Sequence, residues 1–321
     1  MKTNSMNNIP LTSLQISIYN FIIYFIGIIY LPLLIITAYA FDNLNFTYLQ
    51  YLIFVFIIGI TSHKAMTVAH ELLHRPNKLA RLFSKIIYTL TFWLGFYMEH
   101  LYLHHSKKYF LMAEDVEWAR YRESLYQFII RSSKQGLRIL WLCEKERLIF
   151  EKQFIWNINN KAIQTILFPF FAYLMLLIFF KPCSILLLAI GVMFGTLRFI
   201  TSGYLGHYGL LRDKSNMVPD KIHTNHAWDR NDPFNKYFTL GSTRHHLHHL
   251  HPSKHFYEIV KCPTSQVELP YSYETMYLIA LVPFLFFKIM DKKFNELESV
   301  INKNSQLIRI SNLSKLTIKI F

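Results

Sequence analysis

The chain has 321 residues, of which 52% are hydrophobic and 17% charged, and its formal net charge is +14. The apolar residues come in long blocks, which is typical of membrane proteins rather than of soluble domains. Lys and Arg are scattered between these blocks without a recognised nucleic-acid-binding module. We therefore attribute the charge to the positive-inside bias of cytoplasmic loops and expect no nucleic-acid partner.

Four segments are long and apolar enough to cross a membrane as helices. We predict these spans at about residues 17–40, 48–69, 162–180 and 184–205. The loop 41–47 carries no Lys or Arg, which favours the outer face, and Pro182 marks the turn between the last two spans. Residues 1–15 are predicted to be a cytoplasmic tail with little structure. The expected fold is an all-α membrane protein: a single membrane domain, residues 1–321, with a transmembrane helix bundle and a histidine-rich cytoplasmic helical cap.

Two shorter apolar segments, about 83–98 and 276–290, are predicted to be interfacial. If the first one crossed the membrane, the histidine motifs before and after it would lie on opposite faces and would not share a site. The polar stretch 107–161 is expected to be cytoplasmic and helical. The tail from Asp291 mixes Lys with Ile and Leu, which is typical of a basic amphipathic surface helix.

Nine of the fifteen histidines, spread over four motifs, are candidate metal ligands. Most are three or four residues apart, so that each motif presents imidazoles from one helical face. Nine imidazoles are too many for one metal ion and suit two, with four or five ligands each and room for an open position. Imidazole binds Fe, Zn, Cu and Ni, so the ligand type leaves the metal open. The candidate ligands are His70, His74, His100, His104, His105, His207, His245, His248 and His249.

Three carboxylates lie in or near these motifs. The first motif also matches His-Glu-x-x-His, which on a zinc protease interpretation makes Glu71 a general base, but this leaves the other motifs without a purpose. We predict instead that Glu71 accepts a hydrogen bond from a ligand imidazole. Glu99 and Asp115 are candidates for the same role, with a solvated surface acid as the alternative. A non-catalytic metal-binding or transport protein remains a further alternative.

The other histidines are less informative. His63 lies seven residues before His70 on the same helical face, where it either lines a substrate channel or bonds between helices. His246 and His251 lie beside the last motif but off its face. We expect the remaining ones to lie in polar surface loops: His223, His226 and His255.

From about Thr67 to Phe294 the sequence resembles the integral-membrane alkane 1-monooxygenases (AlkB type), within the fatty-acid desaturase and hydroxylase superfamily. The matching motifs are His70–Arg75, Glu99–His105, Tyr204–Leu210 and Arg244–His249. The chain departs from the family pattern at five positions. Gly203 replaces Asn and Gly206 replaces Glu in the third motif, Leu103 replaces Gly in the second, and Thr243 and Leu247 replace polar residues in the fourth. Family members also tend to have six spans.

The resemblance implies a di-iron centre, in which the nine histidines hold two iron ions. It also implies that this centre faces the cytoplasm and that the membrane, in a bacterium, is the inner membrane. It implies O₂ as co-substrate and hydroxylation of an alkane or fatty-acyl chain, at its terminal carbon, with membrane lipid as a further partner. The chain contains no rubredoxin-type cysteines and no Gly-rich dinucleotide loop. Rubredoxin or a similar electron-transfer protein is therefore the expected partner. A fatty-acid desaturase with the same site is the alternative.

Overall fold

The computed structural model describes most of the chain. The described residues are 12–106, 110–112, 115–211, 214–215, 218–219, 226–230, 239–259, 267–304 and 309–310. The predicted N-terminal tail up to residue 11 and His223 lie outside them. The fold is almost entirely helical, and its strands are short antiparallel pairs, β1 with β4 and β2 with β3. The strands are β1 Leu210–Leu211, β2 Lys214–Ser215, β3 Val218–Pro219 and β4 Arg309–Ile310.

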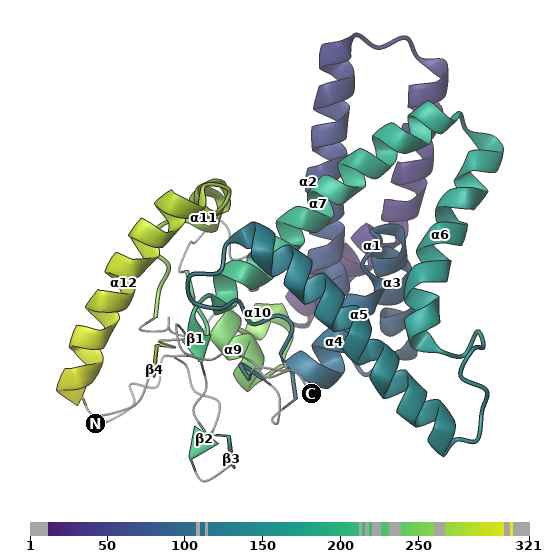
Figure 1. Cartoon of the computed structure of the whole chain (residues 1–321). Coiled ribbons are helices and arrows are strands. Elements are labelled where there is room, and N and C mark those ends of the chain that lie inside the picture. Colours follow the sequence, from purple (N-terminus) through teal and green to yellow (C-terminus); the bar gives the residue numbers. More distant parts are fainter. Residues whose placement is uncertain are drawn as a thin grey trace.

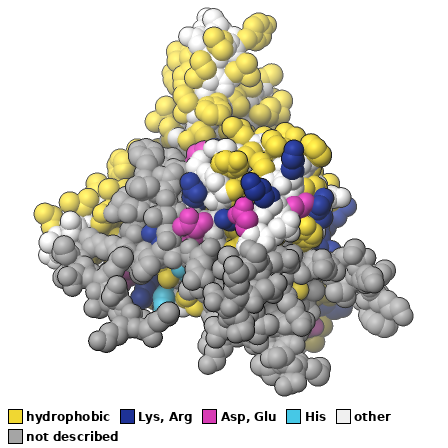
Figure 2. Space-filling view, turned by 90° about the vertical axis from the view of Figure 1, so that its left-hand side faces the viewer, with side chains coloured by type: hydrophobic (Ala, Val, Ile, Leu, Met, Phe, Trp, Pro, Cys, Tyr) yellow, Lys and Arg dark blue, Asp and Glu magenta, His cyan; other side chains and the backbone are white. Residues whose placement is uncertain are grey.

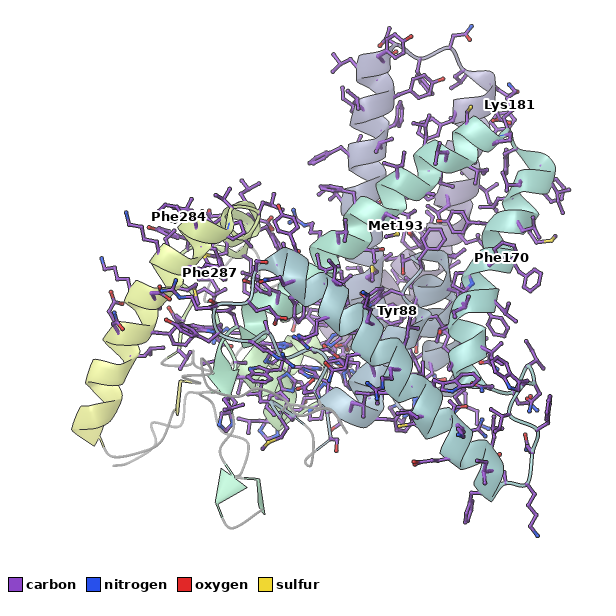
Figure 3. The ribbon with its side chains drawn as sticks, in the orientation of Figure 1. Tyr88, Phe170, Lys181, Met193, Phe284 and Phe287 are labelled. Carbon is purple, nitrogen blue, oxygen red and sulfur yellow. The ribbon has the colours of Figure 1, made fainter. Side chains whose placement is uncertain are left out.

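Within the described residues, four helices are long and apolar enough to cross a membrane (Figure 1). They are α1 Ser13–Asn43, α2 Tyr48–Leu73, α6 Lys161–Phe179 and α7 Pro182–His207. Each coincides with one predicted span to within a few residues, so the predicted all-α membrane fold is confirmed. Figure 2 shows hydrophobic side chains covering the upper part of the molecule, with Lys, Arg, Asp and Glu side chains lower down. Phe170 of α6, 58% exposed, points away from the bundle, as expected for a lipid-facing residue (Figure 3).

Both hairpins turn at the same end of the bundle. The backbone N–H of Lys181 donates to the Asp42 carboxylate at 3.0 Å, and Lys181 Nζ donates to the Asp42 carbonyl oxygen at 2.7 Å. These bonds join the α6–α7 turn to the end of α1 (Figure 3). Pro182 is the first residue of α7, where its missing N–H costs no hydrogen bond. The C-terminal ends of α2 and α7 therefore meet at the opposite end of the bundle.

Glycines bring α2 and α7 into close contact. A Cβ atom at Gly195 of α7 would lie 2.3 Å from the carbonyl oxygen of Gly59 in α2, and one at Gly191 would lie 2.8 Å from the carbonyl oxygen of Val55. Small residues at such positions allow backbones to approach closely in membranes. This packing fixes the relative positions of the two helix ends that carry His70, His74 and His207.

The segments predicted to be interfacial are each divided between two helices. Residues 83–98 belong to α3 (Lys78–Leu90) and α4 (Leu94–Glu99), which are separated by Phe92 at a φ of 57°. Residues 276–290 belong to α11 (Tyr273–Ala280) and α12 (Pro283–Asn304). Their interfacial placement stays a prediction. The polar stretch from residue 107 becomes helical only at α5, Leu125–Phe150, which begins with a capping box between Ser124 and Gln127.

Candidate metal centre

The nine candidate ligands converge from four parts of the chain at the end of the bundle opposite the turns (Figure 1). His70 lies in the last turn of α2 and His74 caps it, while His207 ends α7. The other two parts are a π-helix, η1 (His100–His104), which continues α4, and α9 (His245–Leu250). A short helix, α10 (Phe256–Ile259), follows α9.

The π-helix changes the expected geometry of the second motif. The backbone N–H of His105 bonds to the carbonyl oxygen of His100 at 2.9 Å, so residues five apart, rather than four apart, lie above one another. The Nε2 atoms of His100 and His105 are consequently only 2.9 Å apart. His104 turns to a different neighbour, with its Nε2 at 3.1 Å from Nε2 of His249.

The nine imidazoles form two groups that do not follow the motif boundaries. Within each group the candidate ligand atoms lie within 4.8 Å of one another. The five-histidine group contains His70, His74, His100, His105 and His248. The four-histidine group contains His104, His207, His245 and His249. The second and fourth motifs each contribute to both groups, which ties the two groups into one centre.

Ring nitrogens within each group point at one another. Nε2 of His70 lies 2.8 Å from Nε2 of His100, and Nε2 of His245 lies 2.7 Å from Nε2 of His207. His74 Nε2 is buried and has no hydrogen-bond partner among the described residues. Converging lone pairs repel one another unless a cation lies between them, and buried polar atoms normally have a partner. The donor sets therefore fit metal ions.

Two carboxylates fix the orientation of the imidazoles. Nδ1 of His104 lies 3.0 Å from Asp115 Oδ2, and Nδ1 of His100 lies 2.8 Å from Glu117 Oε1. A carboxylate acceptor keeps the proton on Nδ1 and leaves the Nε2 lone pair toward the metal. Asp115 therefore contacts a candidate ligand imidazole, and its role in orienting a bound ligand stays a prediction. Glu117 was not predicted, although it belongs to the short acidic run Glu114-Asp115-Val116-Glu117 within a basic segment.

Glu71 and Glu99 are placed differently from the sequence expectation. Glu71 Oε1 accepts from Arg75 at 3.1 Å and lies 3.3 Å from Nδ1 of His255, and neither of these partners in the described part of the chain is a candidate ligand. Glu99 is 9% exposed and packs against α5, where a Cβ atom at Gly136 would lie 2.5 Å from its Oε1. It borders the centre without holding an imidazole.

Three further histidines are buried outside the two groups. His63 packs against the rings of Phe199 and Tyr277, which matches the interhelical alternative. His226, expected at the surface, is instead 6% exposed, because residues 226–229 fold inward beside the end of α7. His246 pairs with the buried Asp229 and so anchors α9.

The comparisons with known proteins agree with this geometry. A family model described as fatty acid desaturase matches residues 46–277, well over half of the chain. The chain belongs to the fatty acid desaturase family.

Within this family the chain is similar to alkane 1-monooxygenases. It is 28% identical to the Pseudomonas putida protein over 81% of this chain and 64% of that one. It is also 28% identical to alkane 1-monooxygenase 1 of Alcanivorax borkumensis, over 82% and 65%, and to the Ectopseudomonas oleovorans protein, over 81% and 64%. The resemblance to this type is thereby confirmed. The chain spans less than two thirds of the length of these relatives.

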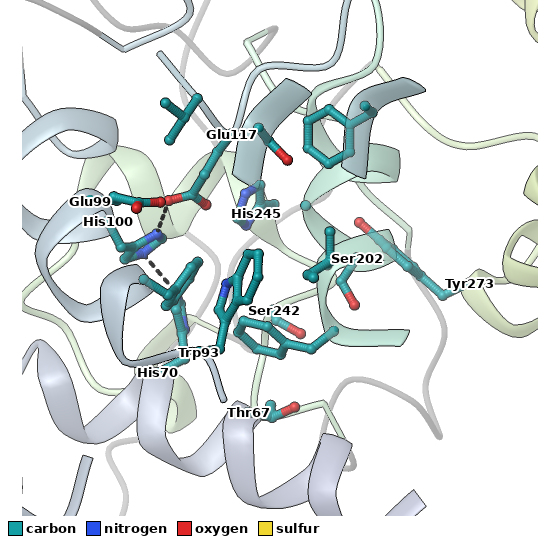
Figure 4. A pocket seen from close by; sticks show the side chains of 17 residues that line it. Thr67, His70, Trp93, Glu99, His100, Glu117, Ser202, Ser242, His245 and Tyr273 are labelled. Carbon is teal, nitrogen blue, oxygen red and sulfur yellow. Dashed lines mark hydrogen bonds and ion pairs between the residues drawn. The ribbon is translucent and has the colours of Figure 1, made fainter. Parts of the chain in front are cut away.

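In this desaturase-family chain an apolar cavity opens directly onto the metal centre (Figure 4). His70 and His100 of the five-histidine group and His245 of the four-histidine group form part of its wall. Its apolar lining includes Trp93, Phe96, Phe128, Phe199 and Ile200. Gly203 also lines the cavity, and a Cβ atom there would meet no heavy atom within 4 Å. Such a site suits a hydrocarbon chain.

Burial sets the protonation of the groups that lie outside the membrane-spanning helices. It lowers the pKa of six imidazoles well below 6.5, so that they are neutral at pH 7. These are His74, His100, His105, His245, His248 and His249. Burial also favours the neutral form of His104, but Asp115 and Glu117 outweigh it and raise the pKa of that imidazole. Burial raises the pKa of Glu99 to about 7 and that of Glu117 to about 8.

These shifts predict that the metal-free protein is most stable near pH 6.5. Below about pH 6.5 the six imidazoles bind protons in the unfolded chain but not in the folded one, so acidification lowers the stability of the folded chain. The raised pKa of His104 has the opposite effect, but it is one imidazole against six. Glu99 and Glu117 keep their protons in the folded chain at a pH where both are already ionised in the unfolded chain. Rising pH therefore favours the unfolded chain, and stability falls again as these protons are lost. Thermal unfolding of metal-stripped protein in detergent between about pH 5 and 9 should give this maximum. A transition temperature that only rises across this range contradicts the assignment, and Glu99→Gln should flatten the alkaline side.

Proposed function

We propose that this protein is a membrane di-iron monooxygenase that hydroxylates an alkane or fatty-acyl chain with O₂ and electrons from a partner protein, at the terminal carbon of the chain. The observation that carries the proposal is the apolar cavity whose wall includes imidazoles of both histidine groups. The similarity to alkane 1-monooxygenases supports the reaction type.

The nine histidines would hold two iron ions, five imidazoles at one and four at the other. Bound iron would supply the reduction of O₂ that makes hydroxylation possible. The overall reaction consumes a C–H bond, O₂, two electrons and two protons, and yields an alcohol and water. Five and four imidazoles exceed the three protein ligands of a catalytic zinc site, which argues against the zinc protease alternative, as does the pairing of Glu71 with Arg75.

The remaining residues of the site position the substrate. The aromatic and aliphatic lining would bind the chain by removing it from water or lipid, at about 0.8 kcal/mol per CH₂ relative to water. The apolar walls would hold the end of the chain beside His70, His100 and His245 and would limit the access of water to the reacting carbon.

The placement of the centre supports a proposed orientation in the membrane and a proposed docking face for the electron donor. The histidines lie at the bundle end opposite the Asp42–Lys181 contact, which we assign to the outer face, so the centre would face the cytoplasm, across the inner membrane in a bacterium. Rubredoxin or a similar protein would dock there, and the positive net charge of the chain favours an acidic partner.

Product analysis under ¹⁸O₂ tests the proposal. The iron-loaded protein in membranes, with a rubredoxin and its reductase, is offered a mixture of alkanes and fatty-acyl esters. We expect terminal alcohol that carries one ¹⁸O atom. An unlabelled double bond would move the protein to the desaturase alternative, which the family description keeps open. The absence of any product from iron-loaded protein contradicts both.

Filling the cavity at Gly203 should shorten the chain that is accepted. The substitution Gly203→Leu adds a side chain at a helical position where a Cβ meets nothing within 4 Å, so it should not destabilise α7. The added Leu side chain takes up the space of roughly four methylenes, and we expect the preferred substrate chain to be shorter by about that number. Competition between alkanes of different length, read by mass spectrometry, checks this. Leu197→Phe, which adds bulk on the exposed side of α7, serves as the control, and an unchanged length preference for Gly203→Leu would refute the placement of the chain.

A further inference from the structure

Glu117 lies between the two histidine groups and contacts both. Its Oε1 accepts from His100 Nδ1 at 2.8 Å, and its Oε2 lies 3.8 Å from Nε2 of His104. His104 Nε2 is the nitrogen that faces His249 inside the four-histidine group, and its Nδ1 is already bound to Asp115. Glu117 therefore faces the ligand side of His104, whereas Asp115 faces the outer side.

The candidate ligand atoms of His100, His104 and Glu117 lie within 4.8 Å of one another, so the carboxylate is as close to them as the imidazoles are to each other. Figure 4 shows the Glu117 side chain reaching His100 at the wall of the cavity. The side chain is only 13% exposed. A carboxylate held at this depth needs a partner of opposite charge, and one hydrogen bond from a neutral imidazole does not supply it.

The four-histidine group has one imidazole fewer than its neighbour, and Glu99, the carboxylate of a contributing motif, packs against α5 and holds no imidazole. Gly206 stands where the motif that this chain resembles has Glu. A Cβ atom there would lie 3.0 Å from Cδ2 and 3.5 Å from Nε2 of His245, so a side chain at residue 206 would point at this group. With glycine at that position, the carboxylate that approaches the four-histidine group comes instead from Glu117.

The charge balance of the site also favours Glu117 as the carboxylate near the four-histidine group. Neutral imidazoles leave the charge of two divalent ions uncompensated in a buried site, and bound cations attract deprotonated oxygen ligands. Asp115 is occupied by three donors: His104 Nδ1 and the backbone N–H groups of Leu111 and Glu117. Glu117 has one oxygen left that faces ligand nitrogens.

We propose that Glu117 is a ligand of the metal ion in the four-histidine group, bound through Oε2, while Oε1 holds His100 of the five-histidine group. This inference rests on the metal centre of the proposed function. It makes the two metal positions chemically different, one with five nitrogen donors and the other with four nitrogens and one oxygen. The same side chain connects the two positions mechanically.

Glu117→Gln separates the two roles of this side chain. The amide oxygen of Gln still accepts from His100 Nδ1, but the amide nitrogen that replaces the other oxygen is not a metal ligand. Glu99→Gln is the matched control, because it makes the same change in another buried acid that lines the same cavity. Unlike Glu117, Glu99 holds no imidazole.

The test uses Co²⁺ binding to the full chain in detergent, followed by visible absorption. In a His70→Ala/His248→Ala background only the four-histidine group is complete, and Glu117→Gln should weaken Co²⁺ binding there at least tenfold and change the absorption spectrum. In a His207→Ala/His249→Ala background only the five-histidine group is complete, and the spectrum should stay unchanged. An effect confined to the five-histidine group, or one equal to that of Glu99→Gln, overturns the proposal.

A second measurement does not depend on these backgrounds. In the otherwise unmodified chain loaded with two Co²⁺ ions, a chelator should remove the ions in two phases, and Glu117→Gln should accelerate only one of them. Acceleration of neither phase, or of both alike, overturns the ligand role. If the unmodified chain binds two Co²⁺ ions but the iron-loaded protein forms no product from any alkane or acyl chain, the proposed function fails while the role of Glu117 is still decided by these data.

Discussion

Replacing His248 by alanine is expected to remove one of the two metal ions and to abolish turnover. Its Nε2 lies 3.0 Å from that of His105, and its ring centroid lies 4.6 Å from those of both His70 and His74, so it occupies the middle of the five-histidine group. Loss of an outer partner typically costs 10–100-fold in metal affinity or activity, and loss of a ligand should exceed about 100-fold. Iron content by elemental analysis and turnover by product formation check this.

The matched control is His251→Ala, which removes an exposed imidazole just after the same motif. It should retain full iron content and activity. If His248→Ala retains both iron ions and normal turnover, the assignment of His248 as a ligand is wrong. The corresponding change His207→Ala should empty the four-histidine group in the same way, because the His207 ring lies 4.5 Å from that of His245.

Replacing Asp115 by alanine should damage both stability and metal binding. The side chain is fully buried and accepts from the Leu111 N–H at 2.8 Å, from the Glu117 N–H at 3.0 Å and from His104 Nδ1 at 3.0 Å. Its loss leaves the buried Leu111 N–H without an acceptor, at about 1–3 kcal/mol, and also frees the partly buried Glu117 N–H. It also frees the His104 ring, which should weaken metal binding by about 10–100-fold.

Thermal unfolding and metal titration of Asp115→Ala measure these two effects separately. Glu146→Ala, which removes an exposed acid from α5, is the control and should alter neither. A variant that melts and binds metal like the unmodified protein would contradict the role of Asp115 as the acceptor that orients His104.

The sequence predicts the membrane helices well because their cause is local. Long apolar blocks mark the four helices, and polar capping residues such as Thr12 and Thr47 mark where α1 and α2 begin. The break between α3 and α4 was not predicted. It depends on Phe92 in a left-handed conformation, which tertiary packing rather than local preference selects.

The nine histidines could be identified from their spacing, but their division into groups could not. Regular helical geometry pairs His100 with His104, whereas the π-helix pairs His100 with His105 and sends His104 to the other group. The contact of Glu117 with His100 could not be predicted from the sequence for a similar reason. It lies in a non-helical segment whose path depends on the buried hydrogen bonds of Asp115, and no periodicity reveals such a contact.

The central claim is that the nine histidines form two metal sites in one centre. The most direct test is the iron-to-protein ratio of the unmodified chain after anaerobic loading with Fe²⁺ and removal of loosely bound metal. We expect two iron ions per chain, and one per chain in both His248→Ala and His207→Ala. A ratio of one or less in the unmodified chain, or a ratio that neither substitution lowers, would contradict the two-site centre.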